Sequence, residues 1–212
     1  MIRRRERERG FTLIELMIVV AVAAILLSAT LALDFRATES WSVERERAAR
    51  LQNFRFACDT IAQQVRSASV IPASVDPTWA GVDVIAIPRP NQMADELWVR
   101  TYKHDTATNA WVTYLSKYST QPDASGRDSI VVELFQETLA PSGGSAIGSH
   151  ISQGKAQPIT EPLGSLAAVY FVRQGNRVLT TVVAKYSIAG VEQVASYTLQ
   201  TVTRSTAARG PS

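Results

Sequence analysis

Glu15 is the residue whose type and position point most clearly to chemistry. It is the only formally charged residue between Phe11 and Leu33, and its neighbours are almost all apolar. A carboxylate in hydrocarbon costs about 2.5–3.5 kcal/mol even on insertion scales, so an acid in such a run indicates a function. The partner that it needs is a cation at the same depth. A cut after Gly10 would create one, the new amino group of Phe11, about one helical turn from the acid.

The segment that must position Glu15 is the apolar run from residue 11 to residue 33. A helix needs roughly 20 residues to cross the bilayer core, so this run is long enough. Five arginines precede it within residues 1–9. Because basic residues remain on the cytoplasmic side, we expect a single-pass helix whose N-terminus is cytoplasmic.

The stretch Gly10-Phe11-Thr12-Leu13-Ile14-Glu15-Leu16 resembles the processing site of type IV prepilins and related pseudopilins. This resemblance implies that a prepilin peptidase cleaves after Gly10 and N-methylates Phe11. It also implies that Glu15, as the fifth mature residue, pairs with the amino group of a neighbouring subunit and sets the register of subunits in a filament. The competing interpretation is a plain signal anchor that tolerates one polar residue.

Length and charge limit the remaining possibilities. A chain of 212 residues suits one membrane helix and one globular domain of ordinary size. The formal net charge is +3, and residues 1–10 alone carry five arginines against two glutamates. Because that leader would account for the whole excess, the sequence pI of 9.2 does not indicate nucleic-acid binding.

A second helical segment is predicted directly after the apolar run, over residues 34–71. No glycine or proline occurs between Phe11 and Ile71, so one continuous helix is allowed, and Pro72 ends it. Apolar residues recur at spacings of three and four and predict a buried stripe, which comprises Leu51, Phe54, Cys58, Ile61, Val65 and Ala68. The prediction is a transmembrane and assembly helix over 11–33 and an amphipathic spine over 34–71.

The chain from residue 72 to residue 206 is expected to form an antiparallel sheet. Runs rich in β-branched and aromatic residues predict strands at 82–87, 97–102, 111–118, 130–135, 166–173, 177–186 and 194–202. Residues 140–164 are rich in Gly, Ser and Pro and predict a long loop, which is either a contact surface or an insertion without a ligand. Residues 207–212 are expected to form a flexible tail. The predicted fold class is α+β, with the long N-terminal helix packed on the sheet in a pilin-like layout.

The end of the second helical segment is similar to the corresponding region of PilW-type minor pilins, through Arg50-Leu51-Gln52-Asn53-Phe54-Arg55-Phe56-Ala57 and the residues that follow. That resemblance implies a minor pilin that acts in pilus assembly or priming. Its location would be the inner membrane, with the C-terminal domain in the periplasm, and then the cell surface. Its partners would be prepilin peptidase, membrane lipid and other pilin subunits through the N-terminal helix. The open alternatives are a minor pseudopilin of a type II secretion system and a DNA-uptake pilin.

Other residue types predict no catalytic, cofactor or metal site, so we expect a protein that is not an enzyme. Cys58 is the only cysteine, and the two histidines, His104 and His150, lie far apart. The run Asp123-Ala124-Ser125-Gly126-Arg127-Asp128 could hold calcium, but Arg127 opposes this and a polar turn is favoured. The aromatic residues of the predicted strands have few basic neighbours, so nucleic acid is not an expected partner.

Overall fold

The computed structural model of the chain describes residues 12–142, 145–160, 166–188 and 190–203. The chain divides into two compact units, Met1–Glu46 and Arg47–Ser212. The described elements, in chain order, are the helix α1 (Leu13–Ser67), the 3-10 helix η1 (Pro77–Trp79), and the strands β1 (Ile85–Ile87), β2 (Met93–Ala94), β3 (Leu97–Asp105), β4 (Ala110–Pro122), β5 (Asp128–Glu137), β6 (His150–Ser152), β7 (Gln157–Pro158), β8 (Leu166–Gln174), β9 (Arg177–Ile188) and β10 (Val191–Val202).

The long helix α1 forms without a break because its sequence contains no glycine or proline. It ends at Ser67, before the predicted end at residue 71, because the backbone after it is used by β3. The backbone N–H of Ser69 donates to the carbonyl of Arg100 at 2.8 Å, and the N–H of Tyr102 donates to the Ser69 hydroxyl at 3.4 Å. These hydrogen bonds to β3 end the helix before Pro72, the residue that was expected to end it.

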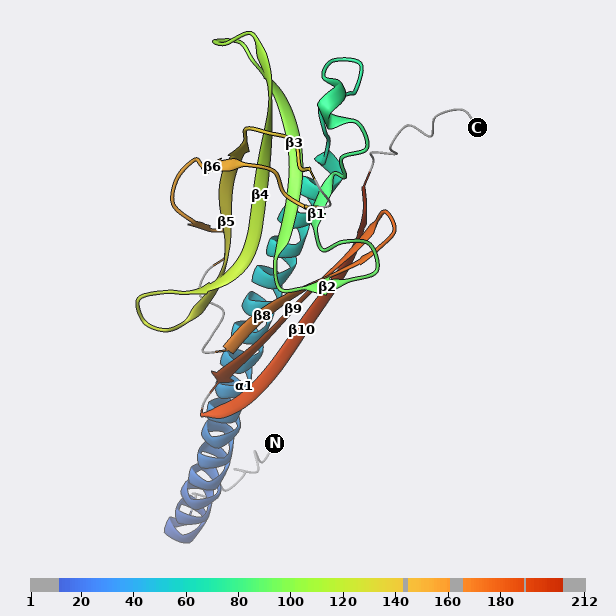
Figure 1. Cartoon of the computed structure of the whole chain (residues 1–212). Helices are drawn as coiled ribbons and strands as arrows, with labels where there is room; N and C mark the ends of the chain where they lie inside the picture. Colours follow the sequence, from blue (N-terminus) through green and yellow to red (C-terminus); the bar gives the residue numbers. More distant parts are fainter. Residues whose placement is uncertain (1–11, 143–144, 161–165, 189, 204–212) are drawn as a thin grey trace, which may run out of the picture. The chain divides into compact units, whose positions relative to one another are not determined.

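The strands form two antiparallel sheets, where the sequence predicted one (Figure 1). In the first sheet the order is β1-β3-β4-β5-β6, and β7 also pairs with β5. In the second the order is β10-β9-β8-β2. The strands that the sequence did not predict, β2, β6 and β7, have two or three residues each, which is too short to show a period of two.

Strands β3 and β4 lie where strands were predicted, and both run further than expected. β3 continues past residue 102 to Asp105, and β4 already begins at Ala110. The C-terminal strands β8, β9 and β10, which were predicted as three separate runs, pair in chain order as an antiparallel meander. Gly175 lies in the turn between β8 and β9 with φ of 59°, a left-handed conformation that glycine adopts without strain.

The described part of the predicted loop at 140–164 contains two short strands, β6 and β7. β6 pairs with the C-terminal end of β5, and β7 pairs with its N-terminal half. Further backbone bonds join the segment to the same strand, including Gln153 N–H to the Leu134 carbonyl at 2.8 Å. The segment is ordered by backbone hydrogen bonds to β5, which its Gly- and Ser-rich composition does not reveal.

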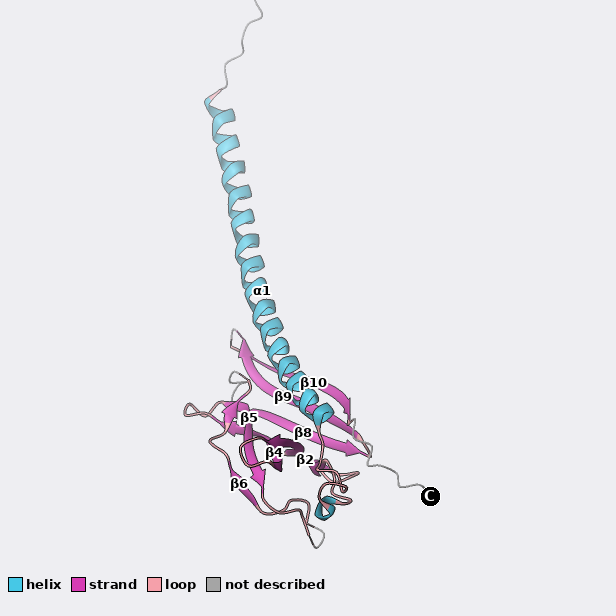
Figure 2. Ribbon diagram, turned by 90° about the horizontal axis from the view of Figure 1, so that it is seen from above, coloured by secondary structure: helices cyan, strands magenta, loops and turns pink. Residues whose placement is uncertain are grey.

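The core of the second unit lies between the C-terminal turns of α1 and the two sheets, and Figure 2 shows these turns beside β9 and β10. The helix contributes Phe54, Ala57, Cys58, Ile61, Ala62 and Val65, which are all buried. This confirms most of the predicted stripe. Leu51 is the exception, since 36% of its surface is exposed. Together these elements give the α+β layout that the sequence predicts, with the C-terminal turns of a long helix packed against antiparallel sheets.

Candidate functional site

Glu15 lies in the first turn of α1, where it forms a reciprocal cap with Thr12. The Oε2 atom of Glu15 accepts from both the backbone N–H and the hydroxyl of Thr12, each at 3.0 Å. The backbone N–H of Glu15 donates in return to the Thr12 hydroxyl oxygen at 3.3 Å. This is the capping box, in which two N–H groups at a helix start find partners in side chains. Glu15 therefore has a structural role at the helix start besides any role in pairing.

Thr12 is a site residue that the sequence interpretation missed. The available signal was its spacing of three from Glu15, since a threonine three residues before a glutamate at a helix start is the capping-box pattern. The other two predicted site residues, Gly10 and Phe11, lie outside the described residues. Within the described part of the chain, the Oε1 atom of Glu15 accepts no hydrogen bond. Among these residues, one carboxylate oxygen thus holds the cap and the other has no hydrogen-bond partner.

Beyond Thr12, the described surface of α1 next to Glu15 is apolar. The large apolar side chains of α1 between Leu13 and Leu33 are all exposed, several of them by more than half of their surface. A window of 18 residues in α1 has a mean hydropathy of 2.8, and none of it is buried in the molecule. Such a surface is not stable in water. By length and composition this part of α1 suits a membrane span, which suggests that the chain is membrane-anchored.

The hydroxyl groups inside this apolar segment are satisfied within the helix. Ser28 donates to the carbonyl of Ile25 at 2.8 Å, and Thr30 donates to the carbonyl of Leu27 at 2.8 Å. Polar groups in hydrocarbon need hydrogen-bond partners within the protein, because no water is present to bond with them. These two residues therefore do not oppose insertion, and Glu15 remains the one costly group in the segment.

Comparison with known proteins agrees with the location of this site. Residues 5–31 match the family described as the prokaryotic N-terminal methylation motif. Searches of curated proteins and of solved structures gave no match. The matched motif is typical of type IV pilins and pseudopilins in general, whose role is structural. It covers the predicted cleavage point, Glu15 and most of the exposed apolar helix.

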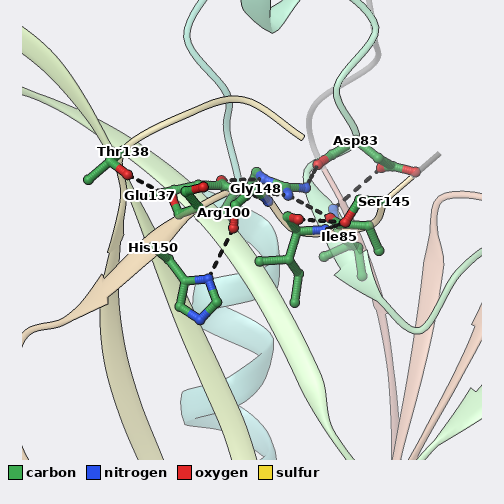
Figure 3. A network of polar contacts seen from close by, with 11 residues as sticks. Asp83, Ile85, Arg100, Glu137, Thr138, Ser145, Gly148 and His150 are labelled. Atoms are coloured by element: carbon green, nitrogen blue, oxygen red, sulfur yellow. Dashed lines mark hydrogen bonds and ion pairs between the residues drawn. The ribbon is translucent and has the colours of Figure 1, made fainter. Parts of the chain in front are cut away.

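A second polar site lies in the unit 47–212, where a buried ion pair joins β3 to β5 (Figure 3). Arg100 Nε donates to Glu137 Oε2 at 2.8 Å, and Arg100 Nη2 donates to Glu137 Oε1 at 2.9 Å. Arg100 is 1% exposed, so the two charges meet almost without water. A bidentate arginine–carboxylate pair is the strongest geometry for such a contact.

This ion pair fixes two loops to the first sheet. Arg100 also donates to the carbonyls of Asp83 at 2.6 Å and Ala146 at 2.7 Å, while Glu137 accepts from the backbone N–H of Gly148 at 2.7 Å. A cavity of about 330 Å³ lies beside these groups. Because the guanidinium and the carboxylate are occupied by the protein itself, we interpret the cluster as an anchor of the segment 138–149.

The predicted polar turn at 123–128 is observed between β4 and β5. The Asp123 carboxylate accepts from the backbone N–H groups of Ser125 at 2.7 Å and Arg127 at 2.9 Å, and it also pairs with the Arg127 guanidinium. The backbone N–H of Arg127 is the main cause that lowers the pKa of Asp123 below its ordinary value. The carboxylate oxygens are thus used inside the turn. Among the described residues, no group of three or more metal-ligating side chains is found.

The remaining residues with reactive side chains are held in packing roles. Burial raises the pKa of the Cys58 thiol to about 12, which leaves it protonated and unreactive. His104 packs against Trp111, with ring centroids 5.0 Å apart. His150 packs against Phe135 at 5.2 Å and against Trp98 at 5.8 Å. The two histidines therefore lie in separate aromatic clusters.

Proposed function

We propose that this chain is a minor pilin subunit of a type IV pilus and acts in the assembly or priming of the filament. The proposal rests on one observation in the first unit. The residues that match the methylation motif, 5–31, overlap with an exposed apolar helix surface that contains one acid, Glu15. Such a surface needs either lipid or other apolar helices around it, and a filament subunit uses both in turn.

Maturation supplies the second charge of the site. In this proposal prepilin peptidase cuts after Gly10 in the inner membrane and methylates the amino group of Phe11. The positive leader holds the N-terminus in the cytoplasm, and the domain that begins at Arg47 is periplasmic before assembly. The new ammonium group lies near the depth of Glu15.

The capping geometry supports a different role for each of the two carboxylate oxygens of Glu15. Oε2 is occupied by Thr12, and Oε1 points to no partner within the described residues. An ammonium group from the Phe11 of a neighbouring subunit can bind Oε1 without breaking the cap. In hydrocarbon such a pair is strongly favoured over two separate charges, so it sets the stagger between subunits.

Three variants separate pairing from capping. Glu15→Val removes the charge and the cap, so membrane insertion should be kept or improved while incorporation into filaments falls. Glu15→Gln keeps an oxygen for Thr12 and removes only the charge, and we expect the same loss of incorporation. Thr12→Val keeps the charge and removes the hydroxyl, so incorporation should stay close to normal.

The readout is the ratio of the chain in sheared filaments to the chain in membranes, measured by immunoblot. Normal incorporation of Glu15→Gln would contradict the pairing role. A loss in Thr12→Val as large as that in Glu15→Gln would show that the cap, and not the charge, is what assembly requires.

The same motif serves type IV pili and type II secretion, so the machine is assigned by the phenotype of a deletion. Loss of surface pili and twitching, with normal release of secreted proteins, is expected for a minor pilin. Loss of protein release with normal pili would instead identify a pseudopilin. Loss of DNA uptake alone would identify a competence pilin.

A further inference from the structure

The strand β10 is the longest strand that lies at the end of either sheet. It pairs with β9 from Val191 to Val202, and it pairs with no other strand in the described part of the chain. The other terminal strands, β1, β2 and β6, have two or three residues each. Proteins commonly protect sheet edges by keeping the last strand short or by placing charges or proline on it. The edge of β10 has none of these protections between residues 193 and 203, where no charged residue, proline or glycine occurs.

From Val194 to Val202 the exposed face of β10 carries two valines and three uncharged polar side chains. Its outward side chains are Val194, Ser196, Thr198, Gln200 and Val202. Val194 is 64% exposed and Val202 is 45% exposed. On the inner face, Ala195, Tyr197 and Leu199 pack against the core but are only partly buried. Apolar surface on both faces of the strand would therefore be removed from water if another strand paired with this edge.

We propose that β10 pairs antiparallel with β10 of a second copy of this chain, so that the two four-stranded sheets become one. The argument for a second copy is that the strand is complementary to itself. In an antiparallel pair related by a twofold axis at Thr198, the axis places Thr198 opposite its own copy. Val194 is then opposite Val202, and Ser196 is opposite Gln200. On the outward face, apolar residues thus meet apolar residues, polar residues meet polar residues, and no like charges face each other.

Neighbouring registers do not give this match. An axis at Tyr197 places Val194 opposite Gln200 and Glu192 opposite Val202. An axis at Leu199 places Ser196 opposite Val202. Only the axis at Thr198 pairs the two exposed valines and keeps Glu192 outside the apolar pairs. On the inner face, Tyr197 then faces Leu199 of the other copy, and Ala195 faces Thr201.

This inference does not rest on the proposed function, because it concerns the unit 47–212 and uses no property of the N-terminal helix. It would hold equally for a pilin, a pseudopilin or an anchored protein of another kind. Membrane anchoring would favour the contact, since two anchored chains diffuse in one plane.

Cysteine cross-linking of the full chain in isolated membranes tests the register. In a Cys58→Ala background, Thr198→Cys should form a disulfide-linked dimer on mild oxidation, because directly opposed Cα atoms lie about 4.5–5.5 Å apart, which a disulfide accepts. Val194→Cys alone should form none, since the two copies of residue 194 would be about 27 Å apart, or eight residues along a strand. Val194→Cys and Val202→Cys, co-expressed with different tags, should cross-link to each other.

Matched controls come from the next strand and from a second opposed pair. Thr181 lies opposite Thr198 on β9, and their hydroxyls are 3.0 Å apart, but it is one strand away from the edge. Thr181→Cys should therefore give no dimer. Ser196→Cys with Gln200→Cys repeats the test if a valine variant fails to accumulate. Thr198→Lys, which places like charges on the axis, should abolish the Val194–Val202 cross-link, while Thr181→Lys should leave it intact.

The outcomes decide the proposal in both directions. A dimer from Thr198→Cys and from the mixed pairs, with none from Val194→Cys or Thr181→Cys, supports it. No dimer from Thr198→Cys overturns it, as does equal cross-linking at every position, which would show random collision. Cross-linking of Thr198→Cys to a different protein would assign the edge to another partner and also overturn pairing between copies.

Discussion

The substitution Glu137→Gln is expected to destabilise the unit 47–212 by about 3–5 kcal/mol, because it leaves a buried arginine without its counter-charge. Arg100 is 1% exposed, so water cannot replace the lost carboxylate. Glutamine has nearly the same shape as glutamate. It keeps one oxygen, which can still accept from Arg100 Nη2 and from Gly148, but it places an amide NH₂ against Arg100 Nε, where Glu137 Oε2 now accepts at 2.8 Å.

The assay is guanidinium unfolding of the purified full chain in detergent, followed by tryptophan fluorescence. Trp79 and Trp98 are both buried and should report the unfolding of this unit. Asp59→Asn is the matched control, because it also removes one carboxylate from an arginine pair. The Arg55–Asp59 pair is exposed and 3.8 Å apart, so its loss should change the free energy of unfolding by less than about 0.5 kcal/mol. A domain of ordinary stability, about 5–15 kcal/mol, would show the difference clearly.

Replacing both partners tests what else the pair does. Arg100→Met with Glu137→Leu removes both charges, which in many proteins restores stability. Here it leaves the carbonyls of Asp83 and Ala146 and the N–H of Gly148 without their partners, at about 1–3 kcal/mol for each group that stays buried. We therefore expect the double variant to remain destabilised and to be cut by protease within residues 138–149.

A loss of unfolding free energy below about 1 kcal/mol in Glu137→Gln, or a loss equal to that in Asp59→Asn, would refute the reasoning.

Two further predictions concern the core. Ile61→Ala should destabilise the same unit by about 2–5 kcal/mol, because Ile61 is fully buried among residues of both sheets, whereas Phe56→Ala on the exposed side of α1 should cost much less. The Cys58 thiol should resist alkylation at pH 8 until the chain unfolds, because burial raises its pKa to about 12. Since the neutral thiol is favoured in the folded state, the contribution of Cys58 to stability is complete below its unfolded pKa. This contribution declines as the pH rises from about 9 toward 12. The melting temperature of Cys58→Ala should therefore fall less over that pH range than the melting temperature of the unmodified chain.

The elements of this fold that could be predicted are those with a long, regular pattern. The apolar run of α1, the stripe from Phe54 to Val65 and the meander that ends at Val202 each repeat over enough residues to fix the type of structure. The fold class follows from them and is confirmed. The division into two sheets was not predictable, because it depends on which strands pair across long separations, such as Met93 with Val172.

The parts of the sites that were missed depend on contacts that no local pattern contains. Arg100 interrupts an apolar strand, which signals a buried partner, but its partner Glu137 is 37 residues away and cannot be identified from spacing. The early end of α1 depends in the same way on a bond from Ser69 to β3. Thr12 differs, because its capping pattern with Glu15 is local and could have been recognised.

N-terminal mass spectrometry of the protein isolated from its own cells tests the central claim most directly. The account predicts a chain that begins with N-methylated phenylalanine at position 11 and lacks residues 1–10. A chain that still begins at Met1 in cells with an active prepilin peptidase would contradict maturation, and with it the assembly function.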